Sequence, residues 1–151
     1  MALTRGPKIV TSGLSLLLDA ADKNSYSGTG STWYDLSGFN RHATLFNTPT
    51  YNTSNLGVLR FDDTAYEYAT VPNIGSLTNF TIDAWARTNK SLTGKVTTII
   101  TNQYDLVSNL NYSLGTNNSP SSYNMTFGFF NGAWRNVTGF SMSLNTWYHL
   151  S

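Results

Sequence analysis

The sequence predicts an all-β protein, an antiparallel β-sandwich or jelly roll. Short apolar or alternating runs recur along its 151 residues, and clusters of Gly, Asn, Ser, Thr and Pro separate them. No segment shows a convincing helical period. The chain is 40% hydrophobic and 14% aromatic, which is enough apolar surface to bury a core. Regularly spaced short strands of this kind are typical of β-sandwiches and jelly rolls.

The expected strands follow one another at 14–18, 57–61, 67–71, 80–87, 96–101, 112–114, 125–130, 137–142 and 146–150. The clearest two-residue period lies in residues 80–87. Side chains there would alternate between a core face and an outer face, since successive residues of a strand point to opposite sides. The core set would be Phe80, Ile82, Ala84 and Ala86, and the outer set Thr81, Asp83, Trp85 and Arg87.

Two polar segments are expected to be loops. Residues 25–40 are rich in Gly, Ser and Thr but contain Trp33, Tyr34 and Leu36, which need somewhere to bury, so we expect a packed loop and not a linker. Residues 117–123 have the Pro and Ser content of a hairpin tip. No internal repeat is visible. We expect an N-terminal arm over residues 1–12 and one sandwich domain over 13–151.

Composition excludes several classes of function. Only 11% of residues are charged, the net charge is +1, and the nine Lys and Arg residues form no cluster, so the chain lacks the electrostatic footprint of a nucleic-acid-binding protein. No apolar run approaches the length of a membrane span. The N-terminus has no apolar stretch typical of a secretory signal. There is no cysteine, so disulfides are excluded.

Five motifs in a fixed order resemble one family: GLSLLLDAADKNSY, TWYDLSGFNRHATL, GVLRFDDTAYEYATVPN, NFTIDAWARTN and NTWYHLS. They resemble the laminin G-like, concanavalin A-like lectin/glucanase domain, and the matches cover nearly the whole chain. Asp63 departs from the family pattern, which usually has Gly after F-D. The resemblance implies a concanavalin A-like jelly roll. It also implies that the strand opened by the final W-x-H motif continues into late strands. We therefore expect a domain that is incomplete at the C-terminus and is completed by a longer parent protein or a partner chain.

The first part of the chain, from GPKIV to YDLSG, looks like the start of virion proteins of tailed bacteriophages, particularly those that infect cyanobacteria. This second resemblance implies a protein of the virion, assembled in the host cytoplasm and acting outside the cell. Its partners would be other virion proteins or copies of itself.

An enzyme is not expected. Glucanases of the resembled fold carry E-x-D-x-x-E, and this chain has a single glutamate, Glu67, so that motif cannot exist here. A cluster of Asp62, Asp63 and Glu67 is more typical of a hydrogen-bonded turn. Neither His42 nor His149 accompanies a nucleophile elbow such as G-x-S-x-G.

Oxygen-rich loops raise the alternative of a Ca²⁺ site. Asp19 with Asp22, or Asp62 with Asp63, could supply carboxylates alongside backbone carbonyls. No dense D-x-D-x-D loop is present, so we favour turn-forming roles for these residues and for Asp35, and no cofactor.

A glycan site would use aromatic faces and polar side chains. The available group is Trp85, Tyr104, Tyr123, Trp134 and Asn131, with Arg135 beside Trp134. Among them we favour Trp134, in the loop-like segment NGAWRN, with Arg135, Asn131 and Tyr104. The other three tryptophans, Trp33, Trp85 and Trp147, are expected in the core.

The sequence thus predicts a phage virion structural or adhesion protein with a lectin-like domain, such as a capsid decoration, tail or fibre component. The alternative is a carbohydrate-binding module that recognises a glycan of the host surface. A glycoside hydrolase is a distant third.

Overall fold

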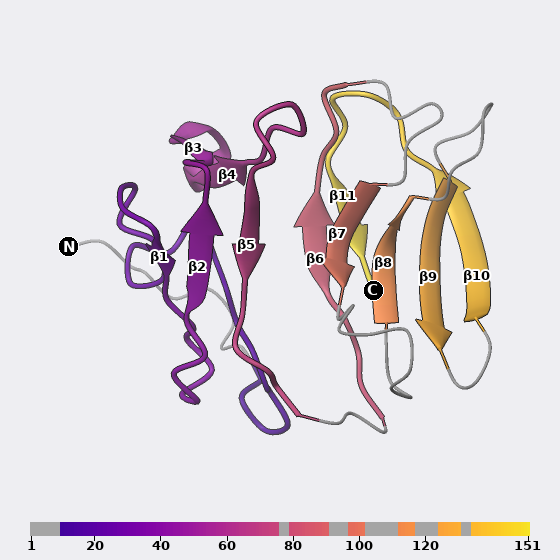
Figure 1. Cartoon of the computed structure of the whole chain (residues 1–151), viewed down its shortest axis with the longest axis horizontal. Helices are drawn as coiled ribbons and strands as arrows, with labels where there is room; N and C mark the ends of the chain where they lie inside the picture. The colour runs from indigo at the N-terminus through magenta and orange to yellow at the C-terminus, as the bar shows by residue number, and fades with distance from the viewer. Residues whose placement is uncertain (1–9, 76–78, 91–96, 102–111, 117–123, 131–133) are drawn as a thin grey trace. The chain divides into compact units, whose positions relative to one another are not determined.

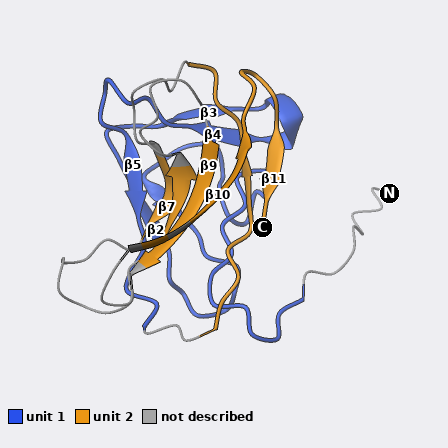
Figure 2. Cartoon of the chain, turned by 90° about the vertical axis from the view of Figure 1, so that its right-hand side faces the viewer, with its two compact units in different colours: residues 1–75 blue, residues 76–151 orange. Residues whose placement is uncertain are grey.

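Every regular element in the described part of the chain is a β-strand, apart from one 3-10 turn at Ser54–Leu56. The computed structural model describes residues 10–75, 79–90, 97–101, 112–116, 124–130 and 134–151. All strand pairs within it are antiparallel (Figure 1). The predicted all-β class is therefore confirmed. The chain divides into two compact units, Met1–Gly75 and Ser76–Ser151, which are coloured separately in Figure 2.

The first unit contains a three-stranded sheet and a hairpin. The sheet has the order β1-β2-β5, with β1 at Thr32–Trp33, β2 at Ala43–Phe46 and β5 at Tyr68–Thr70. The hairpin pairs β3, Thr50–Asn52, with β4, Val58–Arg60. Strand β2 alternates strictly, because Ala43 and Leu45 are buried while Thr44 and Phe46 are exposed. One face of the sheet thus covers a core, as the pleat requires.

The predicted packed loop is confirmed in part: Trp33 and Leu36 are partly buried, but Tyr34 is 47% exposed and Thr32–Trp33 form a strand, β1. Hydrogen bonds close the loop. Tyr34 N donates to Ser25 O at 2.7 Å, and the fully buried Ser25 hydroxyl donates to Tyr34 O at 2.6 Å. Inside the loop, the hydroxyl of the buried Tyr26 donates to Gly30 O at 2.9 Å. Burial raises the pKa of Tyr26, because the phenolate would lose its hydration there. These bonds close the loop on itself, and its Thr32–Trp33 segment, β1, also pairs with β2.

Asp35 is the centre of the segment that follows this loop. It is buried, and its carboxylate accepts hydrogen bonds from Leu17 N, Ser37 N, Ser37 Oγ and Arg41 N. Burial by itself would raise the pKa of Asp35, but the hydrogen bonds from the Ser37 side chain and from backbone amides outweigh it and hold the pKa below its ordinary range. Its backbone N–H donates to His42 Nδ1 at 3.1 Å. The turn-forming role expected for Asp35 is confirmed.

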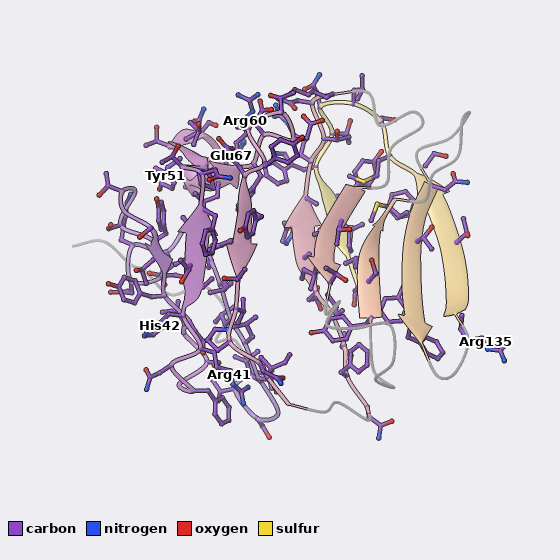
Figure 3. All side chains as sticks on the ribbon, in the orientation of Figure 1. Arg41, His42, Tyr51, Arg60, Glu67 and Arg135 are labelled. Atoms are coloured by element: carbon purple, nitrogen blue, oxygen red, sulfur yellow. The ribbon has the colours of Figure 1, made fainter. Side chains whose placement is uncertain are left out.

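The expected strand at 14–18 is wrong. Those residues are irregular, because they meet their neighbours through single hydrogen bonds and not through a ladder. Leu36 N donates to Leu17 O at 2.9 Å, and the Arg41 guanidinium donates to Ser15 O at 2.8 Å. Figure 3 shows Arg41 and His42 together near the start of β2.

The second unit contains two sheets. A four-stranded sheet has the order β10-β9-β8-β7, and a two-stranded sheet pairs β11 with β6. The bounds are β6 Ala84–Ala86, β7 Thr97–Thr101, β8 Tyr112–Thr116, β9 Asn124–Phe130, β10 Trp134–Ser141 and β11 Tyr148–Leu150. The predicted hairpin tip at 117–123 lies outside the described residues, and the strands it joins, β8 and β9, pair as a hairpin would.

Both sheets of this unit share one core. Its buried members are Leu114 of β8, Met125 of β9, Leu150 of β11, and Met142, which directly follows β10. Ala84 and Ala86 of β6 pack against them, together with Ile82, Ile99 and Tyr148. This face-to-face packing is consistent with the expected β-sandwich, and the finer jelly-roll connectivity stays a prediction.

The described chain contains no helix long and apolar enough to cross a membrane. Residues 1–9 of the expected N-terminal arm lie outside the described residues.

Candidate ligand-binding face

The outer face of the β6–β11 pair carries an exposed tryptophan among polar side chains. The alternation predicted for residues 80–87 is confirmed: Thr81, Asp83, Trp85 and Arg87 are exposed and the residues between them are partly buried. Trp85 is 69% exposed. The expectation that Trp85 belongs to the core is therefore wrong. Since the inner face of β6 holds small alanines against the shared core, the large indole is left on the outer side.

His149 fixes the position of this indole. The register pairs His149 with Trp85 directly across the two strands, so both side chains stand on one face. Their rings are stacked, with centroids 5.0 Å apart and planes at 27°. The His149 Nε2 is hydrogen-bonded to Asp83 Oδ1, two residues before Trp85. Trp85 is thus exposed but held in place, with one ring face against His149.

Arg87 continues the same face on the other side of Trp85. Its guanidinium donates to Asn145 Oδ1 at 3.5 Å. Asn145 is anchored because its backbone N–H donates to Thr88 O at 2.7 Å, in a turn where Asn145 has a φ of 58°. Asparagine tolerates this left-handed conformation better than most residues. The turn before β11 therefore brings an amide beside Arg87. We call Asp83, Trp85, Arg87, Asn145 and His149 the Trp85 face.

The Trp85 face suits a polar ligand with an apolar surface of its own. An indole offers a flat apolar area, while the carboxylate, guanidinium and amide around it offer acceptors and donors for hydroxyl groups. Asp83 and His149 stay accessible, with side chains 57% and 50% exposed. Sugars combine an apolar ring face with a rim of hydroxyls, so this arrangement matches their chemistry.

The same residues do not form a catalytic triad. Ser151 Oγ lies 3.5 Å from Asp83 Oδ2, and the Asp83 carboxylate also binds the His149 ring. A nucleophilic serine must instead meet the nitrogen of its histidine base. Within the described residues His149 and Ser151 are both partners of Asp83 and not of each other.

The structure describes only part of the glycan site that the sequence suggested. Arg135 is exposed on β10, and Figure 3 shows it projecting away from the end of that strand. Trp134 opens β10 in register with Phe130, so it belongs to a strand and not to the loop expected for NGAWRN. Asn131 and Tyr104 lie outside the described residues. Arg135 and Trp85 belong to different sheets, so the residues around Trp134 and the Trp85 face are separate candidates.

The aspartates considered for Ca²⁺ are engaged in local turns. Asp19 Oδ1 accepts from Ala21 N, and Asp22 Oδ1 accepts from Asn24 N, each two residues ahead as in an Asx turn. No three metal-binding side chains converge among the residues that the structure describes.

The second candidate pair, Asp62 and Asp63, lies in the turn between β4 and β5. Asp62 accepts from Thr64 N at 2.9 Å and from the Arg60 guanidinium at 3.2 Å, while its own N–H donates to Glu67 Oε2 at 2.6 Å. Figure 3 places Arg60 and Glu67 close together at this end of the first unit. These contacts agree with the turn-forming role favoured from the sequence.

The sequence already contained a pattern that indicated the Trp85 face, although Trp85 was expected in the core. Alternation already placed Trp85 on the side of Asp83 and Arg87, and two charges two residues either side of a tryptophan are unusual for a core strand. His149 could not be assigned, because only the strand register shows that it lies opposite Trp85.

Comparison of the chain with protein-family models, with curated proteins and with solved structures found no match.

Proposed function

We propose that this chain is a non-enzymatic recognition domain that binds carbohydrate through the Trp85 face. The observation that carries the proposal is an indole 69% exposed yet ordered by a stacked histidine. An ordered aromatic ring gives a ligand contact area at little cost in side-chain entropy. Its polar neighbours supply orientation, as in most small-ligand sites.

Adhesion by a virus particle is the setting that we propose for this activity. Weak single sites become effective when many copies act together, because the second and later contacts form at high local concentration. A virion that displays many copies of such a domain would hold a host surface glycan in this way. This setting rests on the two resemblances of the sequence.

The test is a glycan array probed with a multivalent form of the chain. A sugar ring that covers roughly 100 Å² of the indole would gain about 2.5 kcal/mol at ~25 cal/mol/Å², so Trp85→Ala should weaken binding by ~60-fold. Tyr66→Asn is the matched control. Tyr66 is 80% exposed, lies in the first unit and has a φ of 51°, which asparagine tolerates. Glycan binding that survives Trp85→Ala, or no binding to any glycan, would refute the proposal.

A second function, a structural role through strand addition, is favoured by β10. This eight-residue strand is at the end of the four-stranded sheet in the described residues, and Val137 and Phe140 on it are 66% and 46% exposed. An edge strand with unpaired backbone groups is a template for another chain, and one charge, Arg135, gives little protection. We propose docking of another copy or virion protein here. Val137→Lys should abolish concentration-dependent association in sedimentation; association unchanged by the lysine would argue against this edge.

A further inference from the structure

Within the part of the chain that the structure describes, the Trp85 face has one positive charge without a counterion. Arg87 follows Trp85 by two residues on the outer face, about 6.6 Å further along the strand. Within the described chain its guanidinium has Asn145 Oδ1 as hydrogen-bond partner, at the long distance of 3.5 Å, and no carboxylate pairs with it. Most of the five N–H donors of the fork are therefore free to meet a ligand.

The other end of the face differs in charge. Asp83 is already engaged by His149, and the hydroxyl of Ser151 lies 3.5 Å from its second oxygen. A carboxylate ligand would be repelled at the Asp83 end and attracted at the Arg87 end. A neutral hydroxyl group, in contrast, can donate to Asp83. The face is therefore polarised along β6, with Trp85 between an acceptor end and a cationic end.

We infer that the Trp85 face selects glycans that carry a carboxylate, as uronic acids and sialic acids do. This inference rests on the proposed function. The sugar ring stacks on the free face of Trp85, its carboxylate meets Arg87, and its hydroxyls point to Asp83. A planar guanidinium matches a carboxylate with two parallel hydrogen bonds, which a lysine or an amide cannot reproduce. The hydrogen bond to Asn145 restrains the guanidinium at this end of the face and so limits where the carboxylate can sit.

The test compares each acidic glycan with a neutral counterpart that lacks the carboxylate charge. The probes are oligogalacturonate against its methyl ester, and sialyllactose against lactose, each titrated into the multivalent chain by calorimetry. The wild type should bind the acidic member about 10-fold more tightly, as one charge-assisted hydrogen-bonded pair at an exposed site provides. Arg87→Gln should bring the ratio to about 1, and Arg87→Lys should leave it in between. Arg135→Gln removes the same charge from the other sheet and should leave the ratio unchanged.

The outcomes separate this inference from the proposed function. Equal binding of acidic and neutral members, lost in Trp85→Ala, would overturn the carboxylate preference and leave carbohydrate binding standing. If Arg135→Gln lowered the preference for acidic glycans as much as Arg87→Gln does, the role of Arg87 would be overturned, because the preference would then reflect the net charge of the chain alone. Preference for a sulfated over a carboxylated glycan would overturn the assignment of the anion. Absence of binding to all four probes and to the array would overturn both proposals.

Discussion

Replacing Asp35 by alanine should destabilise the first unit by about 3–5 kcal/mol, because four hydrogen bonds each contribute about 1 kcal/mol and their donors would be left unsatisfied. The Asp35 carboxylate accepts from Leu17 N, Ser37 N, Ser37 Oγ and Arg41 N at 2.7 to 3.0 Å. The residue is only 6% exposed, so water cannot replace the lost acceptor. Such a loss is a large part of the stability of a small domain.

The asparagine variant makes this prediction sharper. An amide oxygen at the Oδ1 position still accepts from Leu17 N and Ser37 N, whereas an NH₂ group at Oδ2 opposes Arg41 N, so we expect a smaller loss of about 1–3 kcal/mol. Asp22→Asn is the control. Its Oδ1 also accepts a backbone N–H in an exposed turn, and an amide oxygen does the same, so its effect should stay within about 0.5 kcal/mol. Urea unfolding measures all three; equal effects of Asp35→Asn and Asp22→Asn would refute the argument.

Asp35 also sets a pH dependence. Its pKa is lower in the folded chain than in the unfolded chain, so the unfolded state binds the proton first as pH falls. The stabilisation is therefore complete above about pH 4, the ordinary range of an aspartate, and is lost as pH falls through the lower folded pKa. Urea midpoints between pH 7 and pH 2 should fall less steeply in Asp35→Asn than in the wild type. Parallel curves below pH 4 would show that Asp35 is not linked to folding.

Two further substitutions test packing by thermal unfolding. Gly57 has a φ of 135°, and a Cβ there would lie 2.7 Å from the Ala20 backbone oxygen and also against the Tyr51 hydroxyl. Gly57→Ala should therefore cost about 2–4 kcal/mol, whereas Gly30→Ala, at a φ of 90° with open space around it, should cost about 1 kcal/mol. Similar costs at the two positions would show that backbone strain alone decides. Met142 is 4% exposed in the core shared by the two sheets of the second unit, so Met142→Ala should lower the free energy of unfolding by about 2–5 kcal/mol. Leu144→Ala, at 44% exposure, is the control and should cost less than about 1 kcal/mol. A small effect of Met142→Ala would argue against a shared core.

The fold class and most strands follow from local pattern, and the exceptions have physical causes. Alternation and turn residues located β4 to β11 to within a few residues. Strands β1 and β3 were missed because they are only two and three residues long and lie among polar residues. The apolar run at 14–18 lacks a ladder partner and is held by a side chain, Asp35, that is distant in sequence. Local periodicity carries no information on such contacts.

The candidate site was harder to predict for a related reason. The aspartate turns could be foreseen, since Asx hydrogen bonds reach only two residues along the chain. The Trp85 face depends on a register between residues more than sixty apart, which brings His149 across from Trp85 and against Asp83. The core assignment of Trp85 used the average burial of tryptophan, and the small alanines that fill the inner side of β6 displace it outward.

The most direct test of the central claim observes the four tryptophan indoles individually. A ¹⁵N-labelled chain gives one side-chain N–H signal for each, and Trp85→Phe identifies the signal of Trp85. Titration with the tightest glycan of the array should move the Trp85 signal and leave that of Trp33, whose Nε1 is buried, in place. Movement of the Trp33 or Trp134 signal with an unchanged Trp85 signal would contradict the claim that the outer face of β6 and β11 is the binding site.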